Sequence, residues 1–258
     1  MGRRSAQERA SSTVPTRCLG AATRLRERRS ESSSKNGKVL DPPHRNLPFP
    51  CFTYDTLQTR LDPSNISWKY YAPAPKRVAG GWNAFSAIQA VAENPGEWKA
   101  HISSPETNVL KDVANGTLPA MSWVIPSIEN SDIPGDPHAG GPAWVASVVN
   151  AIGQSQYWDS TAIVIVWDQW AGFYDPIPPP NRDNQGGPGL RVPMLVVSPY
   201  TPQGYVSHTV YGFGSIVRFV EETFGLKPLG TTDVTSNSME SMFDFKQSPR
   251  PFQQIPSR

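Results

Sequence analysis

The segment over residues 161–167 constrains the fold of this chain more than any other. It reads Thr-Ala-Ile-Val-Ile-Val-Trp, an apolar run rich in β-branched residues and without alternation, which is typical of a strand covered on both faces. Residues 191–197 form a second run of this kind. Because such strands need helices on both sides of their sheet, the sequence predicts an α/β layered sheet with flanking helices.

The other periodic segments are short and fit the same architecture. Apolar residues at helical spacing over 213–224, just before Gly225, predict an amphipathic helix. Further elements are predicted as strands over 66–71 and 121–125 and as helices over 54–61, 82–92 and 142–153. The 27 Pro and 20 Gly among 258 residues interrupt helices often enough to exclude a coiled coil or a helical bundle.

Charge divides the chain into two parts. Residues 1–38 carry ten of the 24 Lys and Arg and three of the 22 acidic residues, which leaves the remainder with a net charge of −5. We interpret residues 1–40 as a disordered basic tail and residues 41–258 as the folded domain. Such a tail can dock on nucleic acid or on an anionic membrane, but the mildly acidic domain does not favour a nucleic-acid partner.

The sequence predicts neither a disulfide framework nor a membrane span. Cys18 and Cys51 are too few for a framework, and their spacing is not that of a zinc site. No stretch approaches 18 apolar residues, so no transmembrane segment is expected. The N-terminus lacks a signal-peptide core, and the sequence as written therefore predicts a cytoplasmic location.

Candidate functional residues follow the predicted strands, because open α/β sheets bind ligands just beyond the carboxyl ends of their strands. Asp168 comes directly after the run 161–167, where a carboxylate either holds a divalent cation or caps a turn. Asp132 lies in a polar loop after a shorter strand, and His208 lies just before the last helix. Ser207 and His208 are not expected to form a nucleophile–base pair, because neighbours in sequence rarely face each other.

At these loops the sequence resembles the bacterial phosphoesterase family, which includes phospholipases C and acid phosphatases. The resemblance extends over residues 47–253 and rests on several motifs that recur in the same order. These motifs occupy residues 118–126, 141–155, 157–168, 191–193, 198–200, 204–208 and 243–245.

The resemblance implies an alkaline-phosphatase-like α/β fold and metal-dependent cleavage of phosphate esters. On this basis we expect Asp168 and Asp132 to bind a divalent metal ion and His208 to be a catalytic residue. The expected substrate is a phosphate ester or a phospholipid. Members of this family are often exported, in contrast to the location that the N-terminus of this sequence predicts.

The sequence also departs from the family pattern. A Glu-Asn-Arg-Ser-Phe-type motif and the hydroxyl nucleophile that follows it are absent, which indicates that only the later half of the family's domain is present. Gln169 replaces a second acid, Ala171 replaces a Gly, and Ile133 and Pro176 each replace a His. The charge lost at Gln169 alone corresponds to about 4 kcal/mol of attraction to a dication a few ångströms away, at an effective dielectric near 20.

These departures predict a truncated phosphate-ester hydrolase with weakened catalysis. The alternative is a non-catalytic remnant that binds phosphate-bearing ligands or a protein partner through the former site. A domain without its first half would also expose a sheet edge and an apolar face, which predicts a partner chain that covers them.

Overall fold

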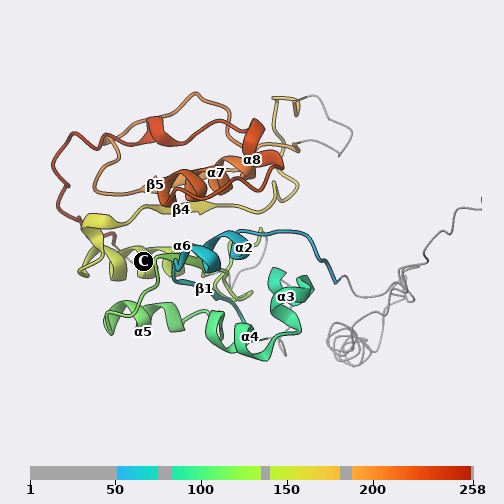
Figure 1. Ribbon diagram of the computed structural model, residues 1–258. Coiled ribbons are helices and arrows are strands. Elements are labelled where there is room, and N and C mark those ends of the chain that lie inside the picture. The colour runs from blue at the N-terminus through green and yellow to red at the C-terminus, as the bar shows by residue number, and fades with distance from the viewer. Residues whose placement is uncertain (1–50, 75–82, 135–139, 181–187, 257–258) are drawn as a thin grey trace, which may run out of the picture.

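The computed structural model describes residues 51–74, 83–134, 140–180 and 188–256, and these form a mixed α/β fold (Figure 1). The strands are β1 (Trp68–Tyr71), β2 (Ile102–Ser103), β3 (Met121–Val124), β4 (Ile163–Val166) and β5 (Met194–Val197). The α-helices are α2 (Gln58–Leu61), α3 (Gln89–Ala92), α4 (Pro95–His101), α5 (Asn108–Ala114), α6 (Gly141–Gly153), α7 (Phe213–Phe224) and α8 (Thr232–Thr235), joined by short 3₁₀ turns. The prediction of an α/β fold is confirmed at this level, and the tail predicted over 1–40 lies outside the described residues.

Two regions can be distinguished in Figure 1. We call the described residues of 51–153 the parallel-sheet region, because β1 lies between β2 and β3 and runs parallel to both. We call the described residues of 154–256 the carboxyl-terminal region, in which β4 pairs antiparallel with β5. In the view of Figure 1 the second region lies above the first.

Strand β1 is buried on both faces. Trp68 and Tyr70 belong to an aromatic core cluster on one face, where the rings of Trp68 and Phe85 lie 5.2 Å apart. Tyr71, which points to the other face because side chains alternate along a strand, belongs to a second cluster. Its hydroxyl donates a hydrogen bond of 2.6 Å to Asp112, and burial together with this bond raises the pKa of Tyr71.

The prediction of double-sided burial is wrong for the two later strands. Side chains of β4 are only partly buried, and Leu195 of β5 is 54% exposed. Within the described residues β4 and β5 pair only with each other, so each strand has one edge without a partner strand. Ile163 of β4 packs against the second core cluster.

The two long helices are confirmed. Helix α7 spans Phe213–Phe224 as predicted, and it ends at Gly225, whose φ of +62° suits a residue without a side chain. Val217, Val220 and Phe224 of this helix pack on the aromatic cluster of β1, so α7 connects the two regions. Helix α6 begins at Gly141, one residue before the predicted start, with Pro142 in its first turn.

The end of the described chain returns to α6. The amide group of Asn150 donates to the Ile255 carbonyl and accepts from the Ile255 N–H, both at 2.8 Å. Phe252 lies so close to Gly153 that a Cβ there would be 2.3 Å from its ring. A glycine at this position therefore allows the last residues to pack on the helix.

Sequence periodicity missed the two short helices α4 and α5. Each has seven residues, too few for a helical pattern of apolar residues to emerge. The predicted helix over 82–92 is resolved as a 3₁₀ turn, Ala84–Ala87, followed by α3, while Trp82 itself lies outside the described residues.

Candidate active site

Asp168 lies where the sequence predicts it, beyond the carboxyl end of a strand. Strand β4 ends at Val166, and the side chain of Asp168 is exposed in the following loop. Its neighbour Trp167 is held by a backbone hydrogen bond from its N–H to the Pro193 carbonyl, just before β5. The carboxylate therefore projects from a loop whose base is fixed by the β4–β5 ribbon.

The loop that carries Asp132 meets this strand end. The indole Nε1 of Trp167 donates a hydrogen bond of 3.1 Å to Oδ2 of Asp132. The start of α6 lies against the same loop, because the Gly141 N–H donates to the Ser131 carbonyl at 3.1 Å and a Cβ on Gly141 would lie 2.8 Å from that of Asp132. The structure thus brings together the loops of Asp132 and Asp168, which the sequence assigned separately.

The rest of the Asp168 loop is tied back to the start of β5. Both carboxylate oxygens of Asp175 accept hydrogen bonds from Arg191, at 2.8 and 2.7 Å. The hydrogen bonds from Arg191 lower the pKa of Asp175 to about 2, so this carboxylate is ionised at neutral pH. At the bend of the loop Ala171 has a φ of +57°, a conformation that suits the glycine of the family pattern better than alanine.

His208 lies between β5 and α7, and its side chain is exposed. The hydroxyl of the adjacent Ser207 donates to the Tyr211 hydroxyl at 3.3 Å, and that oxygen in turn lies 3.3 Å from Oγ of Ser241. This arrangement directs Ser207 toward Tyr211, in line with the expectation that Ser207 and His208 do not form a nucleophile–base pair.

Two carboxylates in adjoining loops are donors of the kind that a divalent cation binds. They do not complete a metal site by themselves. Among the described residues, one group brings three metal-ligating side chains within reach of a single ion, and it consists of Asp62, Glu97 and His101 of the parallel-sheet region. These residues were not predicted from the sequence, although the four-residue spacing of Glu97 and His101 would place both on one face of a helix.

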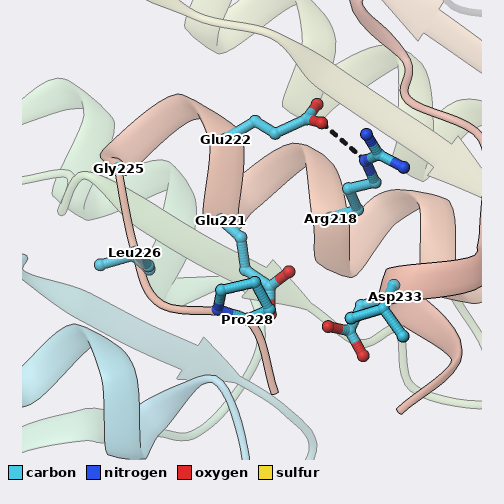
Figure 2. A pocket seen from close by; sticks show the side chains of 8 residues that line it. Arg218, Glu221, Glu222, Gly225, Leu226, Pro228 and Asp233 are labelled. Atoms are coloured by element: carbon cyan, nitrogen blue, oxygen red, sulfur yellow. Dashed lines mark hydrogen bonds and ion pairs between the residues drawn. The ribbon is translucent and has the colours of Figure 1, made fainter. Parts of the chain in front are cut away.

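A separate pocket of about 380 Å³ lies at the end of α7, and none of the predicted site residues lines it (Figure 2). Burial raises the pKa of Glu221, and the neighbouring Asp233 carboxylate adds to this effect. For Asp233 burial acts in the same direction, but hydrogen bonds from Gly230 and Thr231 outweigh it and lower the pKa. Glu221 accepts from the Leu229 N–H at 2.9 Å, so both carboxylates hold the chain that follows the helix.

Comparison with known proteins identifies the chain's relatives. The model of the Phosphoesterase family matches residues 11–227, well over half of the sequence. This chain belongs to that family. The matched range contains the β4 strand end, the Asp132 loop and His208, and it begins inside the segment that we predict to be a basic tail.

Several relatives of this Phosphoesterase family chain are phospholipases C. Phospholipase C B of Mycobacterium tuberculosis is 27% identical over 83% of this chain and 48% of its own length. The non-hemolytic phospholipase C of Pseudomonas aeruginosa is 26% identical over 80% of this chain and 35% of its own length. The protein of the same name from Burkholderia pseudomallei is 30% identical over 67% of this chain and 32% of its own length. The chain thus spans about half or less of the relatives that it matches.

A search of the described helices for a membrane-spanning segment found none of sufficient length and apolarity.

Proposed function

We propose that this chain carries part of the active site of a metal-dependent hydrolase that cleaves phosphate esters, with phospholipids as the substrate class. The observation that supports this most strongly is the Phosphoesterase family match together with the Trp167–Asp132 hydrogen bond inside the matched range. This contact joins two loops that each carry an exposed carboxylate. Relatives named phospholipase C favour a phosphodiester in a lipid over other phosphate esters.

The proposed roles follow from the chemistry of the side chains. Asp168 and Asp132 would contribute carboxylate oxygens to a divalent metal ion, which polarises the phosphoryl oxygens when bound. Trp167 positions Asp132 by donating to one of its oxygens, which leaves the second oxygen available. His208 would exchange a proton with the substrate or the leaving group, since its imidazole is exposed and such a ring can both donate and accept a proton.

We further propose that the chain is the later half of an alkaline-phosphatase-like domain and that its catalysis is weak. The support is its coverage of 48% or less of the relatives' length and the neutral Gln169 beside Asp168. In this account another polypeptide segment pairs with an unpaired edge of the β4–β5 ribbon and covers Leu195, which is 54% exposed. If catalysis is absent altogether, the remaining function is binding of phosphate-bearing ligands at the same loops.

Hydrolysis of chromogenic phosphate mono- and diesters tests this proposal. The full chain is assayed with Mg²⁺, Ca²⁺, Mn²⁺ or Zn²⁺ and with chelator, beside the variants Asp168→Asn and Asp159→Asn. Asp159 is an exposed acid in the 3₁₀ turn Trp158–Ser160, and its variant is a matched control for the loss of one charge. We expect a chelator-sensitive rate, higher for diesters, that Asp168→Asn abolishes and Asp159→Asn leaves unchanged. Equal rates in wild type and Asp168→Asn would refute the assignment.

A further inference from the structure

Asp62, Glu97 and His101 form a compact cluster in the parallel-sheet region, and none of them belongs to the loops of Asp132, Asp168 and His208. Asp62 begins the 3₁₀ turn after α2, and the other two lie one helical turn apart on α4. One potential ligand atom of each side chain lies within 4.8 Å of those of the other two. None of the three was singled out by the sequence analysis, and none has a part in the proposed hydrolysis.

The imidazole of His101 is held in a defined orientation. Its Nδ1 lies 2.9 Å from the Trp68 carbonyl oxygen, which can only accept, so Nδ1 carries the hydrogen. The ring also stacks on the Trp68 indole, with centroids 4.0 Å apart and planes within 4°. In the neutral ring the lone pair is therefore on Nε2. A backbone carbonyl that fixes the tautomer in this way is a common feature of histidines that ligate metals.

Two buried oxygen atoms, one in the cluster and one beside it, lack a hydrogen-bond donor among the described residues. Oε2 of Glu97 lies 3.6 Å from Nε2 of His101, and this oxygen is buried without a hydrogen-bond partner among the described residues. Gln58 is 8% exposed, and its amide donates to Oδ2 of Asp62 while its own Oε1 is buried and unpartnered. Buried oxygens of this kind are costly unless a donor or a cation satisfies them.

Asp62 is positioned in the same way as His101. Trp68 Nε1 donates a hydrogen bond of 2.6 Å to Oδ1 of Asp62, and the Gln58 amide holds the other oxygen. Each carboxylate oxygen retains a second lone pair for a cation. The buried indole of Trp68, 1% exposed, thus orients two of the three ligands, one through its N–H and one by stacking.

We propose that these three side chains bind one divalent transition-metal ion of the zinc class, with water completing the coordination. Ligands about 2.1 Å from a tetrahedral zinc ion are about 3.4 Å apart, close to the 3.6 Å between Nε2 and Oε2. An imidazole ligand favours zinc over Mg²⁺ and Ca²⁺, which prefer oxygen alone. The ion would link the end of α2 to α4 and stabilise the parallel-sheet region. This inference does not depend on the proposed hydrolysis.

Metal binding by the full chain tests the proposal. After dialysis against chelator, zinc is titrated in competition with a chromophoric chelator, and the melting temperature is recorded with and without zinc. We expect His101→Gln and Glu97→Gln each to bind one equivalent of zinc less than wild type, or to bind that equivalent at least about a hundredfold more weakly. The reason is that even residues that only orient a metal ligand contribute 10- to 100-fold to metal affinity. The zinc-dependent rise in melting temperature should disappear in both.

Two comparisons keep the test specific. Glu93→Gln removes a nearby carboxylate that accepts from Gln89 and lies outside the cluster, and it should bind zinc like wild type. Asp168→Asn should also retain the equivalent that His101→Gln loses, whether or not it affects hydrolysis. If the variants do not fold, the cobalt(II) absorption of wild type replaces them, with a tetrahedral spectrum expected. Unchanged zinc binding in folded His101→Gln, or no zinc or cobalt binding by wild type, would overturn the proposal. Glu97 and His101 would then form only an ion pair.

Discussion

Trp68 in the parallel-sheet region is 1% exposed, whereas Tyr174 in the carboxyl-terminal region is 90% exposed. The contrast holds for the two regions as a whole. Of the buried apolar residues other than proline in the described chain, three belong to the carboxyl-terminal region, namely Val220, Leu226 and Met239. Of the large apolar side chains that are exposed, two belong to the parallel-sheet region, namely Phe52 and Tyr54.

From this difference we infer that the buried core determines the stability of the chain and that the exposed loops determine its function. In the core of the parallel-sheet region the rings of Trp68, Tyr70, Phe85 and Trp123 pack against one another, and such packing tolerates little change. The carboxyl-terminal region carries two of the three predicted site residues, Asp168 and His208, on exposed loops, and loops on a rigid scaffold are where binding and catalytic residues concentrate. Substitutions in the aromatic core should therefore change folding, and substitutions in the loops of Asp132, Asp168 and His208 should change activity.

The largest expected effect comes from the aromatic core. Trp68→Ala should lower the free energy of unfolding by about 3–5 kcal/mol, because it leaves a cavity beside Phe85 and removes the donor to Asp62. Tyr174→Ala should change it by no more than about 0.5 kcal/mol. Urea unfolding of both variants measures the difference, and equal losses would show that the two regions do not differ in packing.

An intermediate change in the free energy of unfolding is expected when Asp233 or Glu221, the two carboxylates of the α7 pocket, is substituted. Asp233 accepts from the Gly230 N–H, the Thr231 N–H and the Thr231 hydroxyl, at 2.6–3.0 Å, so Asp233→Asn should cost about 1–3 kcal/mol. Glu221→Gln keeps an acceptor for the Leu229 N–H and removes a buried charge, so at neutral pH it should be neutral or stabilising.

The pH dependence of these two variants has opposite signs. The pKa of Glu221 is raised on folding, so its contribution to stability is full below its unfolded pKa and is lost as pH rises through the folded value. The pKa of Asp233 is lowered, so its contribution is present above its unfolded pKa and is lost as pH falls through the folded value. Melting temperatures measured between pH 3 and pH 8 test both signs. Glu221→Gln should lose the part of the pH dependence that Glu221 causes, and Asp233→Asn should lose the part that Asp233 causes. A wild-type slope in Glu221→Gln would contradict the raised pKa.

The smallest expected change in stability concerns Ala171, in the loop that carries Asp168. Ala171→Gly should stabilise the chain by about 0.5–1 kcal/mol, because relief of the strain at φ +57° exceeds the entropy that an added glycine contributes to the unfolded state. Gly172→Ala, at φ +83°, is the reciprocal control and should destabilise. Thermal unfolding of both variants decides the sign, and a less stable Ala171→Gly would rule out strain at this position.

The elements that sequence predicts well are those whose pattern is local. Helix α7 repeats its apolar residues over 12 positions and stops at Gly225, so spacing alone predicts both ends. Helix α4 was missed because its seven residues carry no apolar repeat, although Asn94 caps it and Pro95 opens it. The burial of β4 was misjudged because composition does not show which strand pairs with it or what covers its faces.

The same distinction applies to the candidate site. Asp168 could be placed at a strand end because the strand and the acid are adjacent in sequence. The contact between Trp167 and Asp132 joins positions 35 residues apart, and no local pattern reports it. The Asp62–Glu97–His101 cluster was missed for the same reason, since it joins a turn to a helix that sequence periodicity did not reveal.

The central claim is that the loops of Asp132, Asp168 and His208 cleave phosphate esters. The measurement that tests it most directly is the rate of phosphodiester hydrolysis by the folded full chain, with divalent metal and with excess chelator, for wild type, Asp168→Asn and Asp159→Asn. Our account predicts a rate in wild type and Asp159→Asn that chelator removes and that is absent in Asp168→Asn. A wild-type rate no higher than that of Asp168→Asn, with all three proteins folded, would contradict it.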